Sequence, residues 1–121
     1  FSLADLTILG GSFVPKGGHN PLEPAAFGLP IITGPHIFKN TAEFAGLRDI
    51  GVVFDMSGCE GDPARAGQAL ADIATAIMKD RAQYRHIASA AKTYAATASK
   101  RSDNAAKMIA AIALAPQTIR E

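Results

Sequence analysis

Cysteine is almost absent from this sequence, because Cys59 is the only one in 121 residues. The chain therefore cannot form an internal disulfide, which fits a reducing compartment. Residues 57–62 around Cys59 are polar and glycine-rich, and they predict a loop without the base that a catalytic cysteine requires. No grouping of His, Cys, Asp and Glu has the spacing of metal ligands, so we expect no protein-bound metal.

Long apolar runs and tryptophan are also missing. No stretch approaches the roughly 20 apolar residues that a helix needs to span a bilayer, and the first residues show no signal-peptide pattern. With 48% hydrophobic, 19% charged and 7% aromatic residues, the composition is ordinary for a soluble α/β or α-rich protein. A length of 121 residues allows a single domain with a modest core.

The net charge of +1 hides an asymmetry along the chain. Residues 1–78 carry four basic and eight acidic side chains, whereas residues 79–121 carry eight basic and three acidic ones. The basic C-terminal third has no interleaved aromatics and no basic run longer than two residues, so we expect no nucleic-acid partner. An anionic membrane surface, an acidic partner domain and solvated helix faces all remain compatible with it.

Short apolar runs alternate with helical patterns in the first 80 residues. The runs predict buried strands, and the glycine, proline and asparagine residues between them mark strand and helix ends. Because strand and helix follow each other repeatedly, the order favours an α/β fold with a short parallel sheet and crossover helices. The predicted strands are 6–9, 29–33 and 52–54, and the predicted helices are 21–27, 41–50 and 63–79.

The alanine-rich remainder predicts two more helices. One begins at Asp80, and the polar residues 102–104 predict a break and an N-cap before a last helix over 104–114, which Pro116 ends. The apolar stripes of these helices are interpreted as core or interdomain packing. His86 falls in the middle of the first helix and is expected to be exposed.

The segment from Gly10 to Pro24 concentrates the residues that suit ligand binding. It leads from a strand into a short helix, so bare backbone N–H groups and a positive helix N-terminus can meet an anion. Its glycines permit positive φ and close approach, and its polar side chains supply neutral donors, one cation and a carboxylate suited to sugar hydroxyls. The candidate binding residues are Gly11, Ser12, Lys16, Gly17, Gly18, His19, Asn20 and Glu23.

Spacing excludes two common phosphate-binding motifs here, the G-x-x-x-x-G-K-[ST] loop and the G-x-G-x-x-G fingerprint. A plain structural turn is the alternative, in which Asn20 caps the helix and Glu23 only reaches back to the Asn20 amide. In parallel sheets, ligands bind outside the carboxyl ends of the strands, which places residues 34–40 at the same cleft. The residues predicted at its rim are Pro35, His36 and Asn40.

A family resemblance rests on the same region. It is carried by Gly10-Gly11-Ser12, Pro15, the run from Gly17 to Ala25, Gly28, Pro30, Gly34-Pro35-His36 and Asn40. These residues resemble the signature of the bacterial 3-deoxy-D-manno-octulosonic acid (Kdo) transferases of lipopolysaccharide synthesis. The likeness runs from about Phe1 to Asn40, and its G-G-H-N-x-L-E-P core is the most specific part. Members of that family are much longer, so the chain resembles the C-terminal part of one.

The resemblance implies a partial Rossmann-like domain of a GT-B-type glycosyltransferase, with two such domains facing across a cleft. The family transfers Kdo from CMP-Kdo to a lipid A precursor at the cytoplasmic face of the inner membrane, with inversion and without a cofactor. Gly11, Ser12, Gly17, Gly18, His19, Asn20 and Glu23 fall on its donor-binding motif. The family's catalytic base belongs to the N-terminal domain, so we expect this chain to hold no catalytic residue and to be inactive alone.

Residues 1–121 are thus expected to form one donor-binding domain, with 104–114 as a helix that crosses toward the N-terminal domain. The stripe of that helix would then be partly exposed in this chain, which favours self-association. Two other functions stay open from the residues alone. One is another nucleotide-sugar enzyme, such as a UDP-sugar transferase or epimerase, and the other is a non-enzymatic interaction module built on the helices of 63–113.

Overall fold

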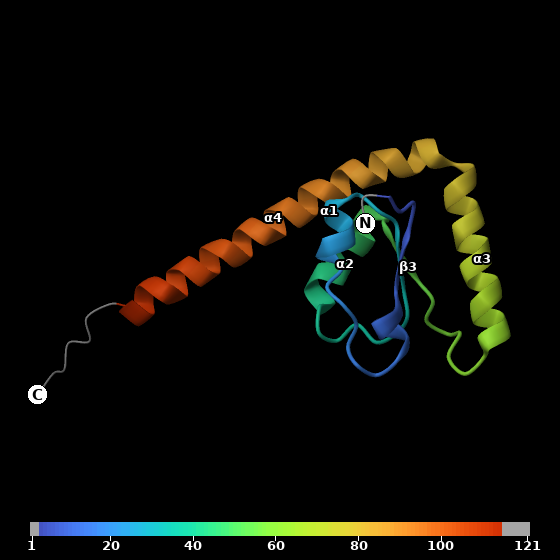
Figure 1. The fold of residues 1–121 in the computed structure, drawn as a ribbon, viewed down its shortest axis with the longest axis horizontal. Helices are drawn as coiled ribbons and strands as arrows, with labels where there is room; N and C mark the ends of the chain where they lie inside the picture. The colour runs from blue at the N-terminus through green and yellow to red at the C-terminus, as the bar shows by residue number, and fades with distance from the viewer. Residues whose placement is uncertain (1–2, 115–121) are drawn as a thin grey trace, which may run out of the picture.

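A three-stranded parallel sheet organises the computed structural model, which describes residues 3–114 (Figure 1). Its strands are β1 (Thr7–Leu9), β2 (Ile31–Thr33) and β3 (Val53–Asp55), in the spatial order β1-β2-β3. Every pair is parallel, and the register sets Leu9 beside Thr33 and Thr33 beside Asp55 at the carboxyl ends. The predicted fold class, a partial Rossmann-like α/β domain with a short parallel sheet, is confirmed.

The helices are α1 (Leu22–Ala26), α2 (Thr41–Ile50), α3 (Pro63–Lys79) and α4 (Arg81–Leu114), with a short 3-10 helix, η1 (Gly10–Phe13), directly after β1. Local signals explain most of these bounds. Gly51 ends α2 in the left-handed region at φ 90°, and the Asp62 carboxylate caps α3 by accepting from the Arg65 amide at 3.0 Å.

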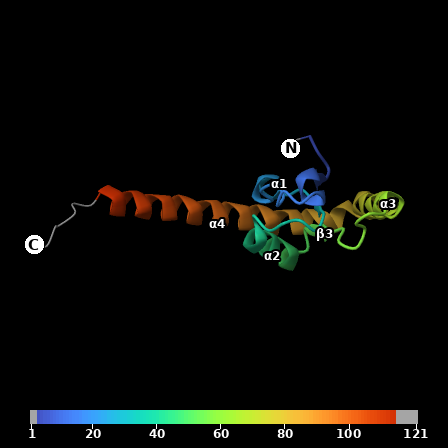
Figure 2. The same ribbon diagram turned by 90° about the horizontal axis from the view of Figure 1, so that it is seen from below.

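The core joins the sheet to one layer of helices. Its buried members come from β1, β2, α1, α2, the residue before β3 and the first half of α4, and they are Leu9, Ala25, Ile31, Phe44, Leu47, Val52, Ala91 and Ala95. Figure 2 shows α4 running between α1 and α2. Close packing there needs small residues, because a side chain at Gly46 of α2 would overlap the ring of Tyr94 of α4.

The predicted break at residues 102–104 is wrong, because α4 is one continuous helix of 34 residues. Residues 81–114 contain neither glycine nor proline, and alanines surround the polar triplet. Cap-forming side chains stabilise a helix end, but they do not interrupt a helix that nothing else stops. The segment 104–114 is therefore the distal end of α4 rather than a separate helix, and Pro116 lies outside the described residues.

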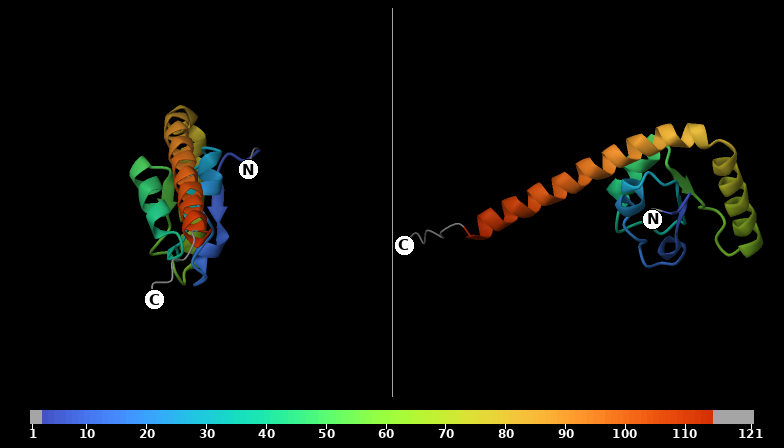
Figure 3. Two further views of the ribbon diagram at one scale, coloured as in Figure 1. Left: turned by 90° about the vertical axis from the view of Figure 1, so that its left-hand side faces the viewer. Right: turned by 45° about the horizontal axis from the view of Figure 1, so that its top comes forward.

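The second half of α4 leaves the body of the molecule (Figure 3). Every residue from Ser99 to Leu114 is exposed, including Met108, Ile109 and Ile112, which are 66%, 67% and 74% exposed. His86 is exposed on the first half of the helix, as predicted. Within the described residues, no helix combines the length and the apolar character needed to cross a bilayer.

Candidate functional site

Ser12 fixes the entrance of the glycine-rich loop. Its side chain is fully buried in η1, where the hydroxyl donates to the Leu9 carbonyl and accepts from the Gly34 amide at 2.7 Å. The Ser12 carbonyl accepts from the His36 amide at 2.9 Å. These bonds join the carboxyl end of β1 to the segment that follows β2, so Ser12 positions two loops, and the one proton of its hydroxyl is already donated.

Gly17 and Gly18 hold the far side of the same loop against residues 36–39. Both have positive φ, at 91° and 77°. A Cβ at Gly17 would lie 2.5 Å from Cγ of Lys39, and one at Gly18 would lie 3.0 Å from the His36 carbonyl oxygen. Glycine is therefore required at both positions by backbone conformation and by close packing together.

The same loop contains four consecutive backbone amides that have no partner in the described part of the chain. Within the described residues, the N–H groups of residues 17–20 donate no hydrogen bond to another part of the chain. Gly17 is nevertheless buried, and buried backbone amides are nearly always paired with protein, water or ligand. The helix that follows, α1, has only five residues and a correspondingly small dipole, so any anion site here depends on the loop amides rather than on the helix.

A hollow of about 410 Å³ lies beside the loop, lined by β1, the first glycines and the start of α1. Here it is called the β1–α1 hollow. His19 covers Gly11 so closely that a Cβ at Gly11 would lie 3.0 Å from the imidazole Cδ2. Asn20 accepts from the Leu22 amide at 3.0 Å through its side-chain oxygen, whereas Glu23 makes no hydrogen bond or ion pair within the described residues. The hollow thus brings together Gly11, His19, Asn20 and Glu23.

The capping alternative is only half realised. The Asn20 side chain does accept from the Leu22 amide, but Asn20 is not the N-cap, because α1 begins one residue later than expected and Pro21 takes that position. The reciprocal bond from the Asn20 amide to Glu23 is absent from the described part of the chain. The Glu23 carboxylate is thus open to a ligand.

The remaining candidate residues lie elsewhere. Lys16 is exposed and makes no side-chain hydrogen bond or ion pair within residues 3–114. Pro35 and His36 line a separate hollow of about 330 Å³ together with Phe13 and Met56, and Asn40 precedes α2 without a side-chain cap. The second hollow shares no lining residue with the first.

Thr7 is the residue at this site that sequence analysis missed. It lines the β1–α1 hollow from the edge strand β1 and is only 7% exposed. Its hydroxyl is the buried side-chain polar atom without a partner in the described part of the chain. The apolar run 6–9 does not point to a binding role for Thr7, because a threonine on a buried strand usually serves packing alone. Among the described residues, no group of three or more His, Cys, Asp or Glu is arranged to hold a metal.

Several known proteins similar to this chain carry the same description. Over 70 residues, or 58% of this chain, it is 40% identical to a 3-deoxy-D-manno-octulosonic acid transferase of Haemophilus influenzae. Proteins with the same description from Chlamydia muridarum and Rickettsia bellii are 43% identical over 58 residues and 54% identical over 41 residues, or 46% and 34% of this chain. The chain resembles the Kdo transferases.

The similarity covers only a part of each relative. The matched segments span 16%, 14% and 10% of the lengths of these three Kdo transferases. No protein-family model matches the chain. The resemblance to Kdo transferases that the glycine-rich segment predicts is nevertheless confirmed, because relatives from distant bacteria carry the same description.

Replacement of Ser12 by alanine in this Kdo-transferase-like segment is expected to destabilise the fold by about 1–3 kcal/mol, because the Leu9 carbonyl and the Gly34 amide lose a buried partner. Urea unfolding followed by circular dichroism measures the change. Ser89→Ala is the matched control, since Ser89 is exposed on α4 and its hydroxyl makes no hydrogen bond within the described residues. Equal stability of the two variants would contradict the positioning role of Ser12.

Proposed function

We propose that this chain is the donor-binding part of a Kdo transferase and that it binds CMP-Kdo in the β1–α1 hollow. The observation that carries the proposal is the run of four unpaired amides at residues 17–20, the last two of which belong to His19 and Asn20 and line the hollow together with Glu23. The names of the relatives supply the reaction class. Together they favour a phosphorylated sugar donor over a purely structural turn.

The loop amides are assigned to the phosphate of CMP. In the transfer, the bond between the anomeric carbon of Kdo and the phosphate oxygen breaks, while an acceptor hydroxyl oxygen bonds that carbon from the opposite face. Negative charge grows on the departing phosphate, and N–H donors already fixed around it stabilise that charge. His19 adds a side-chain donor at the same place, and the acceptor's proton passes to a base outside this chain.

The remaining ligand contacts are assigned by chemistry. Glu23 accepts hydrogen bonds from the ribose hydroxyls, for which an unpaired carboxylate is suited. Gly11 leaves room for the His19 imidazole at the hollow, and Lys16 adds positive charge at the rim. Pro35, His36 and Asn40 lie outside the β1–α1 hollow and are assigned no contact with the donor, and Ser12 acts by holding the loop in place. The donor is already activated by its phosphate, and we assign no cofactor and no metal to the transfer.

The whole reaction requires parts beyond these residues. Residues 1–121 would act as the C-terminal, donor-binding domain of a GT-B-type, inverting enzyme, with 104–114 crossing toward the N-terminal domain. That domain would supply the catalytic base, the lipid A precursor site and the contact with the cytoplasmic face of the bacterial inner membrane. The chain alone would bind donor and not catalyse transfer.

Glu23→Ala is expected to weaken CMP binding at least tenfold, which corresponds to about 1.4 kcal/mol, because the ribose hydroxyls lose their acceptor. Isothermal titration of CMP into the chain measures the affinity, and UMP titration tests the alternative of a UDP-sugar enzyme. Asp49→Ala is the matched control, since Asp49 is an exposed carboxylate on α2, away from the hollow. Unchanged CMP affinity in Glu23→Ala removes Glu23 from the site, and no CMP binding by the unaltered chain overturns the proposal.

A further inference from the structure

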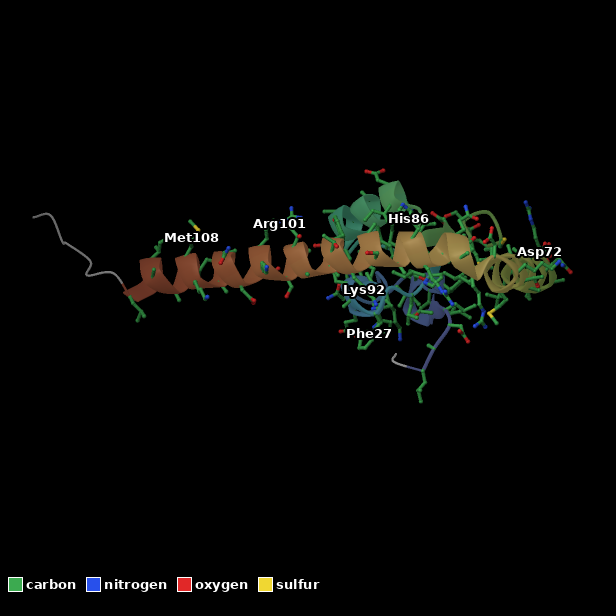
Figure 4. All side chains as sticks on the ribbon, turned by 90° about the horizontal axis from the view of Figure 1, so that it is seen from above. Phe27, Asp72, His86, Lys92, Arg101 and Met108 are labelled. Carbon is green, nitrogen blue, oxygen red and sulfur yellow. The ribbon has the colours of Figure 1, made fainter. Side chains whose placement is uncertain are left out.

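The β1–α1 hollow follows the outer edge of β1. All three residues of that strand line it, namely Thr7, Ile8 and Leu9. Because side chains alternate between the two faces of a strand, a hollow that touches three successive residues lies along the edge of the strand. Its facing wall is the start of α1, on the side of α4 that Phe27 marks in Figure 4. At the usual rise per residue Thr7 lies about 7 Å before Leu9, so the hollow extends from the glycine-rich loop back along β1.

The outer edge of β1 carries a peptide donor and a peptide acceptor that face outward. The Thr7 amide donates inward to the Pro30 carbonyl at 2.8 Å, and inward and outward groups alternate along a strand. The N–H and C=O of Ile8 therefore point away from β2, and β1 has no other neighbour in the sheet of the described residues. An extended residue presents both groups to the same side, as paired residues of an antiparallel ladder do. Ile8 thus offers a donor and an acceptor side by side.

The neighbouring residue adds a third polar group. The Thr7 hydroxyl is buried and has no partner within residues 3–114, and a change of staggered rotamer exchanges it with the methyl group. A buried hydroxyl without a partner is costly, so a ligand atom that bonds it removes that cost. Ile8, Leu9 and Pro24 contribute apolar side chains to the same hollow. The edge of β1 is thus a mostly apolar wall with three polar groups in chain order.

We propose that these three groups bind the base of the nucleotide and select cytosine, an inference that rests on the proposed binding of CMP in this hollow. In chain order they are the Thr7 hydroxyl, the Ile8 N–H and the Ile8 C=O. The pairing edge of cytosine presents two acceptors, O2 and N3, followed by the amino donor N4. The hydroxyl and the N–H donate to the two acceptors, and the carbonyl accepts from the amino group.

Uracil does not match the same order. Its pairing edge places the donor N3–H between two acceptors, so it can bond the Ile8 pair but not all three groups at once. A binding site discriminates against a ligand that leaves one of its buried polar groups unpaired. The Thr7 hydroxyl therefore determines the specificity for cytosine over uracil.

Isothermal titration of CMP and UMP into the full chain tests this assignment. The unaltered chain is expected to bind CMP about fivefold more tightly than UMP, which is the worth of one hydrogen bond. Thr7→Val keeps the shape of the side chain, and it is expected to lower CMP affinity to that of UMP while UMP affinity stays unchanged. Thr7→Ser keeps the hydroxyl and retains the preference. The midpoint of urea unfolding is not lowered in Thr7→Val, because the hydroxyl has no partner in the described part of the chain.

Ile8→Pro tests the peptide pair. It removes the outward N–H, and proline is tolerated on an edge strand where that N–H makes no ladder bond. We expect at least a tenfold loss of affinity for both nucleotides, whereas the control Ile8→Val keeps the amide and binds them as the unaltered chain does. If circular dichroism shows that Ile8→Pro does not fold, the two Thr7 variants decide alone.

Three results contradict the inference and leave the proposed function standing. They are CMP binding no tighter than UMP binding, an equal loss of both nucleotides in Thr7→Val, and unchanged CMP binding by a folded Ile8→Pro. A chain that binds neither nucleotide overturns the inference and the proposed function together.

Discussion

Replacing Phe44 by alanine is expected to lower the free energy of unfolding by about 3–5 kcal/mol. Phe44 is the largest fully buried side chain among the described residues, and it stands on α2 where that helix meets the sheet and α4. Its removal would leave a cavity among Ile31, Leu47 and Ala91, because their backbones are held by the sheet and two helices. A domain of this size has about 5–15 kcal/mol of stability, so the variant would lose a large share of it.

Urea unfolding followed by far-ultraviolet circular dichroism measures this loss. Phe38→Ala is the matched control, because Phe38 is 63% exposed and its truncation is expected to cost less than about 1 kcal/mol. A loss below about 1 kcal/mol in Phe44→Ala would mean that α2 does not share one core with the sheet and α4. Similar effects in both variants would lead to the same conclusion.

Local signals explain why much of this fold could be predicted. The Asp62–Pro63 pair fixes the start of α3, Gly51 fixes the end of α2, and short apolar runs mark all three strands within two residues. Each of these signals acts through neighbours in the chain, so no tertiary contact is needed to interpret it. The parallel order then follows from the alternation of strand and helix.

The errors arise where distant residues decide the structure. The 3-10 turn after β1 depends on a hydrogen bond from the Gly34 amide to Ser12, which lies 22 residues away in sequence. That bond also explains why Ser12 is buried although it lies in a predicted binding motif. The false break at 102–104 arises from a local signal instead. Ser102, Asp103 and Asn104 suit a helix cap, but no glycine, proline or tertiary contact ends the helix there.

The sequence predicted which residues could bind a ligand, and the structure shows that they lie at two different hollows. His19, Asn20 and Glu23 meet at the β1–α1 hollow, whereas Pro35 and His36 line another. The glycines are explained by contacts that sequence cannot supply, namely the close approach of residues 36–39 to Gly17 and Gly18. Loop glycines that suit a ligand here also make room for a neighbouring loop.

Gly17→Val tests both roles of this loop, and its combined effect on stability and binding is expected to be large. A β-branched residue at φ 91° is strained by about 1–2 kcal/mol or more. In addition, its Cβ would meet Lys39 Cγ at 2.5 Å and Phe38 Cε2 at 2.7 Å, so these two side chains must move away from the loop. We expect a loss of unfolding free energy of about 3 kcal/mol or more from the two causes together, and at least a tenfold loss of CMP affinity.

Gly58→Val separates the two causes, because Gly58 has the same φ of 91° and a Cβ added there would meet nothing within 4 Å. It carries the backbone strain without the clash, and it lies away from the β1–α1 hollow. Gly17→Val is therefore expected to exceed it by about 1–3 kcal/mol in urea unfolding and to be the one that weakens CMP binding. If the two valine variants were equally stable, residues 36–39 would not constrain the loop. If Gly17→Val stayed folded and bound CMP as well as the unaltered chain, the amides of residues 17–20 would not hold the phosphate, since their conformation cannot survive a valine in that space.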